Sequence, residues 1–346
     1  MASRSNNTFI TFGTDFVKDL YGNTVVPISS QDAVLVTDYT PDIVPPTLQR
    51  FDFDIKTGIL ILFFSEPVKL HTLNLKEATL LGAPGAPLDE HKRVLTAGTR
   101  AQNFSDFVSV KVNSEDEVAI KERYYLATRR NNTFLSTGKK LVVDVANNFI
   151  TPISSSNALQ VNNFIADTSR PTIQKFSFDL DEGLLEFEFS EPIFANSIRA
   201  EEVNLQNSND VSSAGFASFT LRNGTISYIN DPSVTVKMTD DDLNELKKLA
   251  DLGTGTDTTF VSFTDLFCED MSQNKVTEIL NSSAFQSSVF IEDTTKPNVE
   301  HFSLDMDGGE EVNIVFSEVV KLSTLKPEPI LLLEARGNYS VSVSLQ

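Results

Sequence analysis

FDFDIKTGILILFFSEP, residues 51–67, is the stretch that decides the fold, because the chain repeats it. It returns as FSFDLDEGLLEFEFSEP from Phe176 and as FSLDMDGGEEVNIVFSE from Phe302. The spacing of about 125 residues is typical of one domain, and recurrence at a fixed period indicates a tandem array.

The repeated stretch has the pattern of two strands joined by a tight turn. Apolar and polar residues alternate through Phe51 and Phe53, as expected for a half-buried strand. Asp54 and Gly58 tolerate the backbone angles of a hairpin turn. The apolar residues that follow predict the returning strand, which ends at a Ser-Glu-Pro corner. Most of the stretch is therefore expected to be core and hairpin.

A recurring Asp-x-x-x-Pro element marks the boundaries between copies, and its proline suits a short, stiff linker. It divides the chain into a C-terminal half-repeat at 1–41, complete repeats at 42–166 and 167–292, and the N-terminal part of a repeat at 293–346. Neither end piece contains enough strands to close a sandwich. We interpret the chain as a window from a longer array; the alternative is that the C-terminal piece of one molecule completes the N-terminal piece of the next.

The middle of each copy predicts one short helix. A strand is followed by a cap, Ser114 or Thr239, then by acidic residues that suit a helix N-terminus, and in the second copy by Leu243, Leu246 and Leu249 at helical spacing. About seven strands per copy are expected, which favours a two-sheet sandwich. The predicted fold class is all-β: tandem two-sheet β-sandwiches, each with one short inserted helix.

The composition limits the partners. The 346 residues contain 28 Lys and Arg against 48 Asp and Glu, a net charge of −20, which opposes binding to nucleic acid or an anionic membrane. No apolar run is long enough to span a bilayer. The single cysteine, Cys268, cannot form a disulfide within the chain. Six acceptor sequons favour an extracellular or cell-surface glycoprotein with N-glycans. They are Asn6, Asn103, Asn131, Asn223, Asn281 and Asn338.

Several short motifs resemble a known family. They are FSEPV followed by a Thr-Leu step, the inter-strand helix, an Asp-x-x-x-Asn turn and the Asp-Thr-Thr-x-Pro linker. These are similar to the bacterial-type Ig-like tandem repeats of surface-layer, adhesin and extracellular filament proteins. The resemblance implies an Ig-like sandwich used as a stalk, spacer or filament unit on a cell exterior.

Recurring acidic residues at the linkers and corners are the candidate site. The strand directions place them at one pole of each copy, next to the preceding repeat, where hard oxygen ligands suit Ca²⁺. The alternative is that these residues only cap turns. The candidate ligands are Asp42, Glu66, Asp144 and Asn148 in one copy, and Asp167, Glu191, Asp270 and Asn274 in the next.

No arrangement of residues predicts catalysis. His71, His91 and His301 are scattered, and Asp52 and Asp54 lie on a hairpin without a basic partner. The sequence therefore predicts a non-enzymatic extracellular rod or filament subunit that associates with its own kind. Two alternatives stay open: the stalk of an adhesin whose binding tip lies outside this window, and spacer domains of a secreted enzyme.

Overall fold

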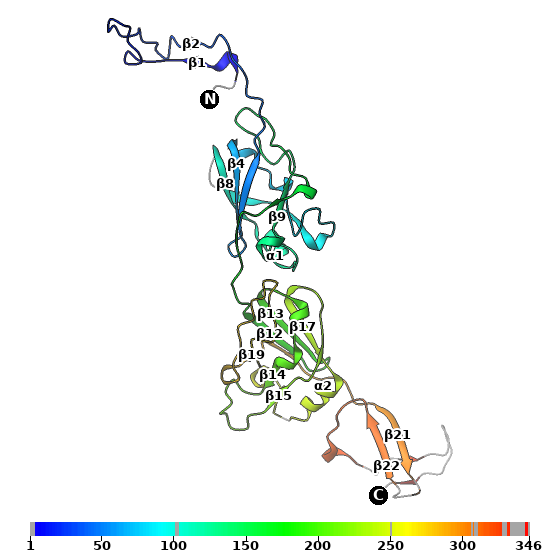
Figure 1. Ribbon diagram of the computed structural model, residues 1–346. Helices are drawn as coiled ribbons and strands as arrows, with labels where there is room; N and C mark the ends of the chain where they lie inside the picture. Colours follow the sequence, from blue (N-terminus) through cyan, green and yellow to red (C-terminus); the bar gives the residue numbers. More distant parts are fainter. Residues whose placement is uncertain are drawn as a thin grey trace.

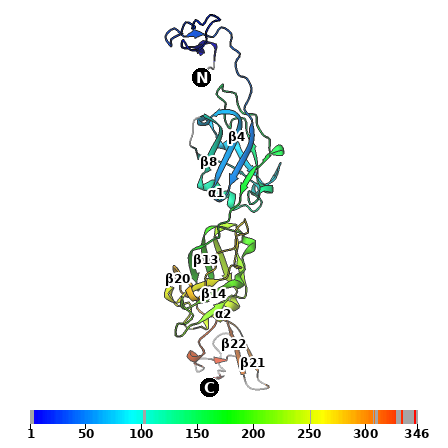
Figure 2. The ribbon, with the colours of Figure 1, turned by 60° about the vertical axis from the view of Figure 1, so that its left-hand side comes forward.

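The computed structural model describes residues 4–100, 104–249, 251–305, 307, 311–326, 331–332 and 343–344. Two β-sandwiches lie end to end, with a small N-terminal piece beyond the first and a β-hairpin beyond the second (Figures 1 and 2). The two ends of the chain lie at opposite ends of this elongated arrangement.

The first repeat is a sandwich of a five-stranded and a four-stranded sheet, with the strand orders β11-β3-β4-β8-β7 and β10-β9-β5-β6. The strands of the larger sheet are β3 (Leu48–Asp54), β4 (Ile59–Lys69), β7 (Gly98–Arg100), β8 (Phe104–Val112) and β11 (Asn163–Ile165). Those of the smaller sheet are β5 (Ala78–Leu81), β6 (Lys92–Val94), β9 (Phe134–Thr137) and β10 (Leu159–Gln160). The final strand, β11, returns to pair in parallel with β3.

The second repeat has the same architecture, with the orders β16-β17-β13-β12-β20 and β15-β14-β18-β19. The larger sheet contains β12 (Ile173–Asp179), β13 (Leu184–Ile193), β16 (Gly224–Ile226), β17 (Asp231–Met238) and β20 (Val289–Ile291). The smaller contains β14 (Val203–Gln206), β15 (Ser218–Thr220), β18 (Phe260–Phe263) and β19 (Phe285–Gln286). The predicted all-β, Ig-like sandwich fold is confirmed. Each repeat has more strands than the seven expected, because three-residue edge strands such as β7 and β16 are too short to show an alternating pattern.

One α-helix crosses each sandwich, as predicted: α1 (Ser114–Lys121) and α2 (Asp240–Lys247). The predicted cap Thr239 accepts a hydrogen bond from the Asp242 amide. In the first repeat the cap is Asn113 and not Ser114, because the Asn113 side chain accepts from the Asp116 amide. The 3₁₀ turns are η1 (Ser5–Asn7), η2 (Leu70–Thr72), η3 (Leu75–Glu77), η4 (Asp89–His91), η5 (Arg130–Asn132), η6 (Ser155–Asn157), η7 (Ala195–Ser197), η8 (Ala200–Glu202), η9 (Thr256–Thr258), η10 (Asn281–Ser283) and η11 (Leu322–Thr324).

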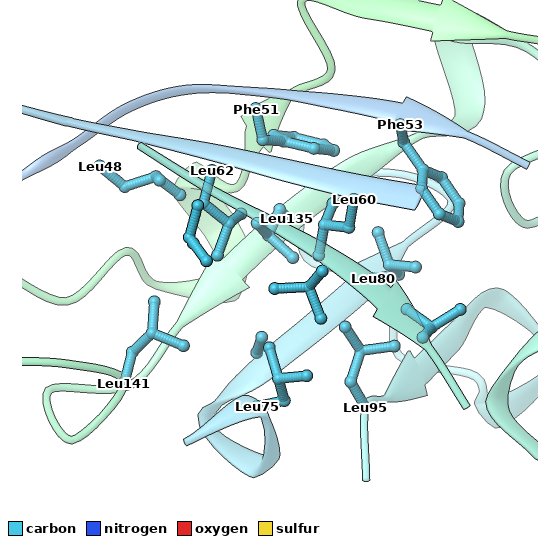
Figure 3. Packing of buried hydrophobic residues seen from close by; sticks show 14 of the residues in the cluster. Leu48, Phe51, Phe53, Leu60, Leu62, Leu75, Leu80, Leu95, Leu135 and Leu141 are labelled. Carbon is cyan, nitrogen blue, oxygen red and sulfur yellow. The ribbon is translucent and has the colours of Figure 1, made fainter. Parts of the chain in front are cut away.

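The repeated stretch forms the centre of each core. Phe51 and Phe53 are 0% and 1% exposed, and their counterparts Phe176 and Phe178 are equally buried. Figure 3 shows Phe51 and Phe53 packed with leucines of the first repeat, among them Leu60. Each complete repeat thus buries a hydrophobic core of its own, which is the basis of an independent domain.

The end pieces expose the positions that the complete repeats bury. Phe302 and Leu304, the counterparts of Phe51 and Phe53, are 58% and 42% exposed. Within the described part of these pieces the strands form two-stranded sheets. They are β1 (Phe9–Ile10), β2 (Val34–Leu35), β21 (Val299–Asp305), β22 (Glu311–Phe316), β23 (Leu331–Leu332) and β24 (Val343–Ser344). Among the described residues, no second sheet covers these strands as it does in a complete repeat.

Candidate functional site

The predicted acidic residues lie close together at one end of each complete repeat, the pole at which the linker from the preceding part of the chain enters. Carboxylate oxygens of Asp42, Glu66 and Asp144 lie within 4.8 Å of one another. In this first cluster Asp42 is exposed, Glu66 is half-buried and Asp144 is buried. The pairing of β4 with β8 shifts register between Phe63 and Val68, across the Ser-Glu-Pro corner, and Val68 pairs with Asp144.

The second cluster consists of Asp167, Glu191 and Asp270, whose carboxylate oxygens also lie within 4.8 Å of one another. It is more deeply buried than the first, since Asp167 and Asp270 are 5% and 4% exposed. The Glu191 side chain is 10% exposed. Residues of the preceding repeat, among them Lys121, line a small cavity together with these three acids.

The two predicted asparagines hold the loops that present these acids. Both the backbone amide and the side-chain nitrogen of Asn148 donate to Asp144, at 2.7 and 2.8 Å. Asn274 donates to Asp270 in the same way, with both distances 2.8 Å. Each side-chain nitrogen also donates to a linker carbonyl, that of Asp42 or Asp167. The asparagines therefore tie the loop to the linker through their amide nitrogens.

A lysine from the preceding repeat enters the second cluster. Lys121 lies in the last turn of α1, and its Nζ is 2.6 Å from Asp167 Oδ2 and 3.2 Å from Glu191 Oε2. Its side chain is only 18% exposed. The cavity that remains at this junction, about 10 Å³, is close to the minimum for one water molecule. The Lys121 ammonium group thus supplies positive charge at the pole where the sequence predicted Ca²⁺.

The same contact recurs one repeat further along. Lys247, in the last turn of α2, lies 2.8 Å from Asp293 Oδ2 and 3.1 Å from Glu318 Oε2. Asp293 and Glu318 are the linker and corner acids of the next copy. We call this arrangement, in which a helix-terminal lysine contacts the linker Asp and the corner Glu of the following repeat, the lysine junction.

Other contacts fix each junction. At the first, the Tyr124 and Phe194 rings stack with centroids 4.6 Å apart, and Asn230 Nδ2 donates to the Glu122 carbonyl at 3.0 Å. At the second, the Val319 amide donates to Asn244 Oδ1 at 3.0 Å. Each junction thus has a hydrogen bond between neighbouring repeats besides its ion pairs, and the first also has an aromatic stack.

The burial of these charges changes their pKa values. Burial raises the pKa of Glu191 to about 7; Lys121 opposes this shift and Asp167 adds to it. Burial also acts to raise the pKa of Asp167, but the hydrogen bonds from Lys121 and the Ser169 amide outweigh it, so the pKa lies below its usual value. In the first cluster, burial and the charges of Asp144 and Asp42 raise the pKa of Glu66. Keeping these buried carboxylates ionised therefore costs free energy unless a cation lies beside them.

A buried aspartate anchors each lysine-bearing helix. Asp116 is 0% exposed; it accepts from the Thr96 amide at 2.7 Å and contacts Arg93 at 2.7 Å. Its counterpart Asp242 is 1% exposed and accepts from the Arg222 amide at 2.7 Å. Since the helices have only eight residues each, these contacts set where the lysine emerges.

The sequence reading missed the lysines, although a signal was present. The segments KVNSEDEVAIK and KMTDDDLNELK end in Lys121 and Lys247 at matching positions. A recurring lysine at the end of a helix, facing a recurring acidic pole, could have suggested the pair. Only the tertiary packing of the helix against the next repeat shows that the two meet.

The remaining candidate residues lie as follows. Four sequon asparagines, Asn6, Asn131, Asn223 and Asn281, are exposed, whereas Asn103 and Asn338 lie outside the described residues. Cys268 is 2% exposed, and burial raises the pKa of its thiol.

The hairpin aspartates make structural hydrogen bonds. Asp52 Oδ1 accepts from the Asn163 amide and Asp54 Oδ1 from the Thr57 amide, at 3.0 and 3.1 Å. No described helix is long and apolar enough to cross a membrane.

No protein-family model and no curated protein matches the chain. Solved structures with some similarity include the S-layer protein rSbsC(31-844), with 9% identity and a TM-score of 0.25 over 79% of this chain and 32% of that one. The N-terminal four Ig domains of Dscam1 isoform 8.4 give 11% identity and a TM-score of 0.20 over 78% and 55%. A marsupial T cell receptor gives 10% identity and 0.15 over 74% and 76%. The chain thus spans about a third of the first and about half of the second, and TM-scores this low carry no argument about function.

Proposed function

We propose that this protein is a non-enzymatic structural element of a cell exterior, a rod or filament subunit built of tandem Ig-like repeats. The observation that carries the proposal is the recurrence of the lysine junction. Both Lys121 and Lys247 join the end of one repeat to the linker and corner of the next. A chain whose repeats are joined by the same contact transmits orientation along its length, as a rod requires.

Exposed sequons agree with an exterior location. Asn6 and Asn131 occupy matching positions, each in a 3₁₀ turn that precedes a strand, and both are exposed. Glycans at these positions would cover the sides of the rod and leave the poles free for end-to-end contact. Release of glycans by an amidase, followed by mass measurement of the asparagine-containing peptides, would test the assignment.

Calcium at the acidic clusters remains a separate hypothesis. The cluster of Asp42, Glu66 and Asp144 is the less buried of the two. Loss of thermal stability on adding a chelator, with recovery on returning Ca²⁺, would support it. An unchanged melting temperature would contradict it.

Electron micrographs of the native material test the main proposal. We expect straight, ordered polymers or rods with an axial repeat set by this chain. Isolated rods that end in a distinct head would favour an adhesin stalk. Turnover of a polysaccharide by the native protein, with the catalytic module elsewhere in it, would favour a spacer role. Flexible strings without a constant angle between repeats would contradict the rod.

A further inference from the structure

We propose that the cluster of Asp42, Glu66 and Asp144 is the receiving half of a further lysine junction. Its partner is the helix-bearing pole of another repeat of this kind that carries a free helix-terminal lysine. The inference rests on the proposed function, because it treats the first complete repeat as an inner member of a longer assembly.

The first ground is that all three acidic poles share one construction. The corner serine before each glutamate accepts a hydrogen bond from a backbone amide of the linker, at 2.9 Å for Ser65, 3.0 Å for Ser190 and 2.9 Å for Ser317. The serine amide returns a bond to the carbonyl of the same linker residue at 2.9, 2.9 and 2.8 Å. Glu66 is therefore held in the same local setting as Glu191 and Glu318.

The second ground is that both of the other poles hold an ammonium group. Lys121 and Lys247 each bridge the linker Asp and the corner Glu at distances between 2.6 and 3.2 Å. Among the described residues, no lysine or arginine forms such a pair with Asp42, Glu66 or Asp144. The arrangement that binds a lysine twice is thus present a third time.

The third ground is electrostatic. Three carboxylates in close contact repel one another: burial raises the pKa of Glu66 most, and the charges of Asp144 and Asp42 add to that rise. A cation removes this repulsion. Lys121 and Lys247 are already paired within this chain, so the cation that we propose for this cluster is the lysine of another repeat.

The donor set favours an ammonium group over a metal ion. Both carboxylate oxygens of Asp144 already accept from Asn148, whose side-chain nitrogen also donates to the Asp42 carbonyl. Ca²⁺ requires six to eight oxygen ligands, whereas an ammonium group requires about three acceptors. Asp42 and Glu66 are the counterparts of the linker and corner acids that contact Lys121 and Lys247 at the other poles.

Carbodiimide coupling of the native, assembled protein tests the inference. The reagent activates carboxylates, which form an amide with a lysine in contact or, failing that, with added glycine ethyl ester. Lys121 with Glu191 and Lys247 with Glu318 serve as controls inside every molecule. We expect peptide mass spectra to show Glu66 or Asp42 joined to a lysine other than Lys121 or Lys247, in a segment that resembles the ends of α1 and α2.

Each other outcome counts against the inference. Glycine ethyl ester on both Glu66 and Asp42, with the controls joined to their lysines, would show that the pole is free. Labelling that appears only after a chelator is added would show a metal ion. Protection without a lysine link and without chelator dependence would show a different partner.

The purified chain without other repeats supplies the baseline. There we expect glycine ethyl ester to label Glu66 while Glu191 remains protected. In native assemblies we expect the Glu66→Gln variant to lose the link at residue 66 and to keep the two control links. Ordered rods in micrographs together with a free Glu66 would overturn this inference and leave the proposed function standing.

Discussion

The two lysine junctions use the same pair of acids in different surroundings. Lys121 meets Asp167 and Glu191 beside a third carboxylate, Asp270, and an aromatic stack lies next to it. Lys247 meets only Asp293 and Glu318 within the described residues. The comparison teaches that the lysine is common to both junctions. The neighbouring carboxylates differ, and they determine how strongly the stability of each junction depends on its lysine and on pH.

Removal of the lysine should have the largest effect. We expect Lys121→Met to destabilise the junction by about 2–4 kcal/mol, because it leaves buried carboxylates without a cation. Lys247→Met should destabilise the second junction less, by about 1–2 kcal/mol, because it leaves two carboxylates without a cation where Lys121→Met leaves three. Hydrogen exchange of the helix and linker amides during urea unfolding would measure both values.

Lys175→Met is the matched surface control, since Lys175 pairs with Glu188 while its side chain is 66% exposed. It should change stability by less than about 1 kcal/mol. Equal effects of all three substitutions would contradict the importance of the junctions.

Loss of the helix anchor should come next. Asp116→Ala removes the acceptor for the Thr96 amide and the partner of Arg93, so we expect a loss of about 2–3 kcal/mol. Asp242→Ala should cost less, because Arg222 is 64% exposed and water can replace its contact. Thermal unfolding of the two variants would rank them. A larger loss for Asp242→Ala would reverse the expected order.

The pH dependence should separate the junctions. Glu191 has a pKa of about 7 in the folded protein and about 4.3 when unfolded. Between these two pKa values the folded state binds a proton that the unfolded state has released. The contribution of Glu191 to the free energy of unfolding is therefore fully present below the lower pKa and is lost as pH rises towards 7. Glu191→Gln should remove this decline, which amounts to about 2–3 kcal/mol between pH 5 and pH 8.

Urea unfolding at intervals from pH 5 to pH 8 would measure that decline. Glu318→Gln is the matched variant at the second junction, where we expect the decline of the parent protein to persist. The difference between parent and Glu191→Gln isolates this residue from Glu66 and Asp270, whose pKa values are also raised. Parallel curves for the parent and Glu191→Gln would contradict a raised pKa of Glu191 as the cause of the decline.

The aromatic stack should have the smallest effect. Tyr124→Ala removes the ring that stacks on Phe194, a contact worth about 0.5–1.5 kcal/mol beyond area burial. We expect a small rise in exchange of the linker amides at the first junction and none at the second. Tyr124→Phe keeps the ring and should behave as the parent. A loss in Tyr124→Phe would assign the effect to the hydroxyl group.

The sequence predicted those parts of the molecule that depend on local pattern. The alternation around Phe51, the turn at Gly58 and the helix after Thr239 are local, and the structure has them. The convergence of Asp42, Glu66 and Asp144 followed from strand direction alone. The short edge strands and the Lys121 contact could not be predicted in this way, because they depend on where a neighbouring segment or repeat lies.

The lysine junction also has a direction. One end of each repeat donates the ammonium group and the opposite end supplies the carboxylates, so the contact joins unlike surfaces. A contact of this heterologous kind that does not close into a ring adds units without limit and gives every chain two different ends. Assemblies built through it are polar, and two units cannot satisfy both surfaces by pairing face to face. An assembly that grows by joining the lysine-bearing pole of one unit to the acidic pole of the next would therefore have all its units pointing in the same direction.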